Sequence, residues 1–124
     1  RRERRQAHNL GPDLVAFERR FEWLEGLAKY VELEIWRQAA ATDGYQPLPV
    51  MDDDPDFDGY TGFDGRWSQE VSQMKRQASL EGDTRFYYTG MAQATLLDRL
   101  MPGWKELALK EGRWLEDLLE QALE

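Results

Sequence analysis

Residues 13–41, which read DLVAFERRFEWLEGLAKYVELEIWRQAAA, decide the fold of this chain. Apolar side chains recur here at alternating steps of three and four residues, at Leu14, Phe17, Phe21, Leu24, Ala28, Val31 and Ile35. That spacing places all seven on one face of an α-helix, and it predicts a helix from about residue 13 to about residue 41. Gly26 interrupts an otherwise strong helical pattern, because glycine costs a helix about 1 kcal/mol relative to alanine.

Helical patterns also fill the second half of the chain. We predict helices over 66–80, 83–100, 103–110 and 113–123, with Pro102-Gly103 and Gly112 as the breaks between the last three. Residues 1–12 form a basic N-terminal segment, and residues 42–65, rich in Gly, Pro and Asp, form an acidic loop. No alternation typical of strands stands out. The predicted fold is therefore all-α, a single helical domain or subdomain of four or five helices.

The composition is that of a soluble globular chain with a strongly acidic balance. Of the 124 residues, 41% are hydrophobic and 32% charged, and the formal net charge is −8. This charge argues against nucleic acid or an anionic membrane as a partner, because both require a positive field. Cys is absent, which excludes disulfides, Cys zinc sites and thiol nucleophiles. The first residue is Arg rather than Met, which indicates a piece of a longer polypeptide.

Two features of these helices bear on function. Glu25 lies at the edge of the apolar face, where a carboxylate needs a partner, and Gly26 beside it allows another backbone to approach closely. Gly90 and Ala94 similarly make a small-residue face suited to tight helix–helix contact, and Tyr87 lies one turn before Gly90. Taken separately, the first feature is also explained by a solvated acidic face and the second by an ordinary core stripe.

Together the two stretches resemble the aminopeptidase branch of the gluzincin zinc metallopeptidases. WLEGLAKY at 23–30 is similar to a helix of that family that reads W-L-N-E-G-x-A-x-Y, and YYTGMAQATLLDRL at 87–100 is similar to its Y-x-x-G segment. The separation of Glu25 and Tyr87, 62 residues, is also close to that of the family. The resemblance implies a fold like the C-terminal helical subdomain of a gluzincin catalytic domain. It further implies that Glu25 is the third zinc ligand and that the Tyr87 hydroxyl stabilises the transition state.

A gluzincin also needs H-E-x-x-H, in which two His bind zinc and a Glu activates the zinc-bound water. The single His of this chain is His8. Two explanations stay open. In the first, the motif lies upstream in a longer polypeptide. In the second, it has decayed in place. Counting back from Glu25 by the spacing of the family leads to RERRQ, where Glu3 keeps the position of the general base and Arg2 and Gln6 replace the two His.

The acidic loop contains a partial calcium-binding pattern. Asp54, Asp56 and Asp58 alternate as in the first half of an EF-hand loop, but Gly65 stands where that loop requires a bidentate Glu. We therefore predict a solvated loop.

Two hypotheses of function follow. The first is the C-terminal fragment of a zinc metallopeptidase, inactive alone, which acts on a peptide or protein substrate together with the upstream part of the same polypeptide. Zinc is implied by the resemblance only. The second is a non-catalytic helical module that binds peptides or proteins. A peptidase whose zinc motif has decayed would be one example of such a module. Whether the protein is an enzyme depends on an H-E-x-x-H motif upstream of this chain.

Overall fold

The fold is all-α, as the sequence predicts. The computed structural model describes residues 7–9, 11–57, 62–77, 80, 82–110 and 112–124. These residues form helices and connecting turns and contain no strand. The helices are α2 (Pro12–Ala41), α3 (Pro49–Asp52), α4 (Phe63–Gln77), α5 (Thr84–Leu100), α6 (Trp104–Ala108) and α7 (Leu115–Leu123).

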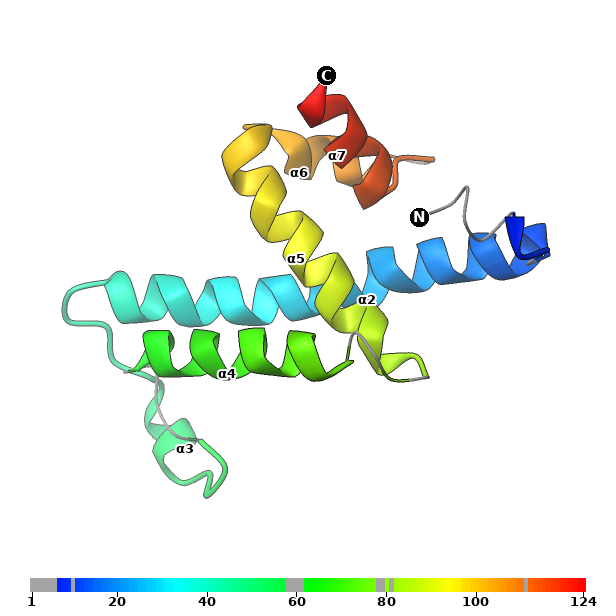
Figure 1. Ribbon diagram of the computed structural model, residues 1–124. Helices are drawn as coiled ribbons and strands as arrows, with labels where there is room; N and C mark the ends of the chain where they lie inside the picture. Colours follow the sequence, from blue (N-terminus) through cyan, green and yellow to red (C-terminus); the bar gives the residue numbers. More distant parts are fainter. Residues whose placement is uncertain (1–6, 10, 58–61, 78–79, 81, 111) are drawn as a thin grey trace.

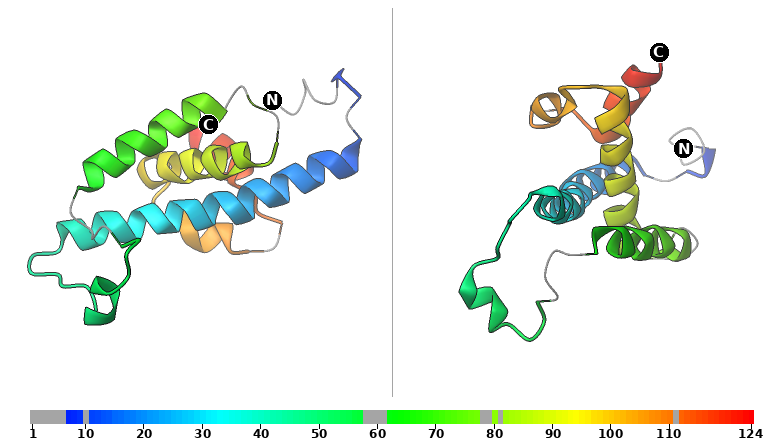
Figure 2. Two further views of the ribbon diagram at one scale, coloured as in Figure 1. Left: turned by 90° about the horizontal axis from the view of Figure 1, so that it is seen from below. Right: turned by 90° about the vertical axis from the view of Figure 1, so that its left-hand side faces the viewer.

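Helix α2 is the longest helix of the described residues, and α5 crosses it (Figure 1). Pro12 is the first residue of α2, where its missing N–H costs nothing. Helix α5 is central, because it contacts α2, α4 and α7. Seen along α2, helices α4 and α5 lie to one side of it (Figure 2, right).

The predicted elements are present, with shifted ends. The helix predicted over 66–80 is α4, which begins earlier, at Phe63, and ends at Gln77. A short helix, α3, lies within the segment predicted as an acidic loop. The predicted breaks before and after α6 coincide with Gly103 and Gly112, whose φ angles of 87° and 74° are in the region that favours glycine.

The hydrophobic core lies around α5 and extends to the C-terminal helices. Five α5 residues are buried: Phe86, Gly90, Met91, Ala94 and Leu97. Helices α6 and α7 add buried side chains to the same cluster, namely Trp104, Ala108, Leu115 and Leu118. None of the helices in the described part of the chain is both long enough and apolar enough to cross a membrane.

Helix α2 buries a different face from the one that its apolar pattern suggests. Its buried residues are Glu22, Gly26, Tyr30 and Leu33. We call the seven apolar residues at alternating steps of three and four (Leu14, Phe17, Phe21, Leu24, Ala28, Val31 and Ile35) the α2 seam. Five of these seven side chains (Leu14, Phe17, Leu24, Val31 and Ile35) are between 50% and 56% exposed. The pattern correctly predicted the helix, but the core forms on its other side.

Candidate functional site

The two glycines singled out in the sequence meet at the crossing of α2 and α5. A Cβ atom added to Gly90 would lie 2.6 Å from the Cα of Gly26, and one added to Gly26 would lie 2.8 Å from the carbonyl carbon of Gly90. Real Cβ atoms essentially never come this close to another heavy atom. The backbones therefore touch directly, as the sequence predicted, and each glycine is required by the other helix.

Glu25 and Tyr87 lie next to this crossing and contact each other. A hydrogen bond with the Glu25 carboxylate is the largest cause of the raised pKa of the Tyr87 phenol, followed by burial. The ring of Tyr87 also packs edge-on against Phe21, with the ring centroids 6.1 Å apart. Both side chains are partly exposed. The structure thus brings together the two residues that the resemblance assigned to one site.

The neighbouring carboxylates of α2 are already engaged with α5. Glu22 is buried and accepts a short hydrogen bond from the Thr89 hydroxyl. One turn earlier, Glu18 accepts a hydrogen bond of 3.1 Å from the Arg85 guanidinium. Both contacts lie on the N-terminal side of the glycine crossing, where they hold the two helices in register. The carboxylate of Glu25 instead lies beside the neutral Tyr87 hydroxyl.

The described residues do not by themselves make a zinc site around Glu25. No group of three or more His, Cys, Asp or Glu side chains that could hold a metal ion occurs among them. His8 is exposed, and Arg2, Glu3 and Gln6, the positions of the possible decayed motif, lie outside the described residues. One carboxylate is too few for zinc, which takes three protein ligands even in catalytic sites. Further ligands would have to come from outside the described residues.

A second polar cluster joins α2 to α4. Glu70 is only 4% exposed, and its Oε1 atom is 3.1 Å from the Lys29 ammonium and 3.0 Å from the Arg66 Nε. Both cations also pair with Glu32 on the surface of α2. A buried carboxylate is tolerated only with such compensation, so this cluster is explained by the packing of α4 on α2. Burial is the main reason why the pKa of the adjacent Tyr88 is raised.

A half-open groove of about 520 Å³ lies between α2, α4 and α5, beside α6. Apolar and aromatic residues line part of it: Tyr30, Leu33, Phe63, Trp67 and Met91. The rest of the lining is polar, from Glu34, Arg37, Thr95, Asp98, Arg99 and Lys105. Its volume is within the usual range of ligand pockets.

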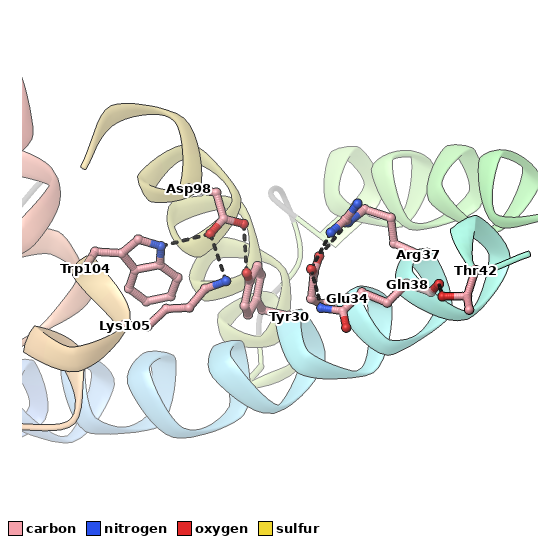
Figure 3. A network of polar contacts seen from close by, with 8 residues as sticks. All are labelled: Tyr30, Glu34, Arg37, Gln38, Thr42, Asp98, Trp104 and Lys105. Atoms are coloured by element: carbon pink, nitrogen blue, oxygen red, sulfur yellow. Dashed lines mark hydrogen bonds and ion pairs between the residues drawn. The ribbon is translucent and has the colours of Figure 1, made fainter. Parts of the chain in front are cut away.

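Asp98 is the centre of the polar contacts in this groove (Figure 3). It accepts hydrogen bonds of 2.8 Å from the Tyr30 hydroxyl and 3.0 Å from the Trp104 indole N–H, and its Oδ1 is 3.2 Å from the Lys105 ammonium. Burial raises the pKa of Tyr30, and the Asp98 hydrogen bond adds to the shift. The contacts tie α2, α5 and α6 together, so the primary role of Asp98 is structural.

Glu34 is the other carboxylate of the groove and is also paired. Its hydrogen bonds from Arg37, at 2.6 and 2.8 Å, lower its pKa to about 2. Gln38 donates to the same carboxylate at 2.8 Å (Figure 3). An acid with so low a pKa is a poor general base near neutral pH. Glu34 is therefore not suited to accept a proton from a molecule in this groove.

The acidic loop is described only in part. Asp54 and Asp56 are exposed, and the Asp56 N–H donates to the Asp54 carboxylate at 2.9 Å. Asp58, the third residue of the partial calcium pattern, lies outside the described residues.

Sequence reasoning identified the Glu25–Tyr87 pair but missed the groove. Tyr30 and Asp98 lie within the two stretches that carry the resemblance. Because they are 68 residues apart, no local sequence pattern predicts their contact. In comparisons with known proteins, no protein-family model, curated protein or solved structure matched this chain. The relationship to gluzincins therefore stays a prediction.

Proposed function

We propose that this chain is the C-terminal helical part of a gluzincin-like zinc metallopeptidase domain and contributes Glu25 and Tyr87 to the active site. The observation that supports the proposal is the Glu25–Tyr87 contact at the α2–α5 crossing. Two weak motifs, far apart in the sequence, meet there with a carboxylate and a hydroxyl on partly exposed side chains. If the two motifs resembled the family only by chance, their carboxylate and hydroxyl would have no reason to lie next to each other in the fold.

The two residues have separate roles in this proposal. Glu25 provides one metal ligand, and the remaining ligands and the general base come from polypeptide outside this chain. The Tyr87 hydroxyl donates a hydrogen bond to the substrate oxygen that gains negative charge during peptide hydrolysis. In this chain alone the Glu25 carboxylate lies beside the same hydroxyl and raises its pKa. The chain by itself is expected to have no peptidase activity.

The test uses the natural polypeptide that contains this chain. Its zinc content is measured by mass spectrometry, and its activity by cleavage of a fluorogenic peptide library. We expect Glu25→Gln to remove zinc, and Tyr87→Phe to retain zinc while lowering kcat by about 10²–10³-fold, as for loss of one oxyanion donor. Tyr88→Phe is the matched control, because Tyr88 lies near Glu70 instead. A parent polypeptide without an upstream His pair, or full zinc content in Glu25→Gln, would refute the proposal.

A second candidate is a non-catalytic helical interaction module. The observation that favours it is the exposed α2 seam, because monomeric proteins rarely leave a continuous apolar stripe in water. Under this alternative the parent polypeptide binds its partner equally well with Tyr87 or Phe at position 87, and it contains no stoichiometric zinc. Zinc analysis and binding measurements on the same variants therefore distinguish the two candidates.

A further inference from the structure

The α2 seam is a continuous apolar surface. Its residues recur without a break from Leu14 to Ile35, a stretch of about 32 Å along the helix axis. Five large side chains on it are half exposed, while Phe21 is partly covered by the rings of Phe86 and Tyr87. A strict alternation of three and four residues is the repeat of a coiled-coil seam rather than of a surface helix.

The seam lies on the side of α2 opposite to the core. Gly26 and Leu33, which are buried, project about half a turn away from the middle of the seam on a helical wheel. Helices α4 and α5 pack on that buried side (Figure 2, right). Apart from Phe21, which packs on α5, the large side chains of the seam are thus half exposed and lie away from the packed face of α2.

We propose that the α2 seam docks a single amphipathic α-helix of different sequence, with an apolar stripe at the same spacing and a basic residue facing Glu25. A helix fits because the seam is straight, narrow and about six turns long. The apolar contact does not depend on the peptidase proposal, whereas the basic residue facing Glu25 requires a Glu25 that does not bind zinc.

A second copy of this chain fits the seam poorly in either direction. In an antiparallel pair centred on Leu24, Phe21 lies opposite the small Ala28, so the sizes match, but Glu25 faces Glu25 of the other copy. In a parallel pair Arg20 faces Glu25 of the other copy, so the charges match, but Phe21 then lies opposite Phe21 and Ala28 opposite Ala28. A helix of different sequence can satisfy size and charge together.

Glu25 determines the charge that the partner needs. The other acids on this edge of the seam already pair with cations. Glu18 pairs with Arg85, and Glu32 pairs with Arg66 and Lys29. Glu25 is partly exposed at the edge of the seam, and within the described residues it has no ion pair, only the adjacent neutral Tyr87 hydroxyl. Its negative charge is therefore available to an incoming cation. A chain of net charge −8 also disfavours an anionic membrane as the occupant.

The test uses the 124-residue chain and two fluorescein-labelled helical peptides with identical apolar heptads. One peptide carries Lys at the positions that can face Glu25, and the other carries Glu there. Fluorescence anisotropy is expected to give about fivefold tighter binding of the Lys peptide, from one attractive pair replaced by one repulsive pair. In Glu25→Gln the difference should fall below about twofold.

A variant of the seam tests the apolar contact. The double substitution Leu24→Gln and Val31→Gln should weaken binding of the Lys peptide about thirtyfold, because both side chains lose the burial that the partner completes. Val50→Gln is the matched control, since Val50 is 71% exposed and lies in α3, outside the seam. Circular dichroism and urea unfolding of each variant verify that the fold is retained.

Three outcomes would overturn the inference. The first is no binding of either peptide at 100 µM by the folded chain. The second is a concentration-dependent dimer in sedimentation equilibrium that the Leu24/Val31 variant abolishes, because the occupant is then a second copy. The third is binding of phosphatidylcholine or phosphatidylglycerol vesicles that the same variant abolishes, because the seam then binds a membrane.

Discussion

Gly26→Ala tests the central contact of the fold. A Cβ atom at position 26 would lie 2.8 Å from the carbonyl carbon of Gly90 and 3.1 Å from the amide nitrogen of Met91. Ordinary van der Waals contact begins near 3.4 Å, and the obstructing atoms are backbone, which cannot rotate aside as a side chain can. Helices α2 and α5 must therefore separate by about 0.6 Å or more, and a gap of this size loses a quarter or more of the dispersion attraction.

The magnitude follows from two opposing effects. Alanine stabilises the interior of a helix by about 1 kcal/mol relative to glycine. Overpacking of a close contact costs typically 1–3 kcal/mol, and a clash between two backbones belongs at the upper end, about 3 kcal/mol. We expect Gly26→Ala to lower the free energy of unfolding by about 2 kcal/mol, the difference between these two effects.

Urea unfolding followed by circular dichroism and Trp fluorescence measures this change. With a typical m-value of 1–3 kcal/mol/M, the midpoint should fall by about 1 M while m stays constant. Gly65→Ala is the matched control, because Gly65 is in helix α4 with nothing within 4 Å of its added Cβ, and it should unfold at the same or a higher midpoint. A Gly26→Ala midpoint equal to or above that of the wild type would refute the close crossing.

Two further variants test the polar contacts of the groove. Asp98→Ala should lower the free energy of unfolding by about 1–3 kcal/mol, because the buried Tyr30 hydroxyl and Trp104 indole N–H lose a charged acceptor. An unchanged urea midpoint would contradict this expectation. The pKa of Glu34 is lowered to about 2, so its contribution is present above its ordinary value of 4.5 and is lost as the pH falls from there towards 2. Because Arg37 is half exposed, solvent screening limits that loss to about 0.5–1 kcal/mol. In acid–urea titrations Arg37→Gln should reduce the loss of stability between pH 4.5 and 2 by about this amount.

The existence of the helices could be predicted from the sequence because it depends on local patterns. The spacing of apolar residues in 13–41 and the Pro102-Gly103 break are signals carried by near neighbours in the chain. The close approach at Gly26 and Gly90 was also predictable, because glycine inside a helix needs a reason that outweighs its cost.

The buried face of α2 could not be predicted in the same way. Hydrophobic patterns do not record that a glycine lets a neighbouring backbone replace a side chain, so the face with Gly26 and Glu22 looks polar in sequence. Burial of Glu22 depends on Thr89 in another helix, and that of Glu70 on Lys29 and Arg66. Such compensation is a property of tertiary contacts, and no local pattern expresses it.

The separation of the two faces of α2 makes stability and recognition independently testable. Substitutions at the glycine crossing should change unfolding, because that face holds α5. Substitutions at Leu24 and Val31, which are half exposed, should change binding with little effect on stability. Glu25 is at the edge of the seam and also contacts Tyr87 from α5, so it belongs to both. If Glu25→Gln removes zinc from the parent polypeptide, the metallopeptidase proposal is supported. If the metal content is unchanged and the preference for a basic partner helix is altered, recognition alone is supported. The same substitution therefore decides between catalysis and binding. Replacing a zinc-binding carboxylate by an amide removes the metal, whereas loss of a charge contact on the surface changes only the preference for the partner.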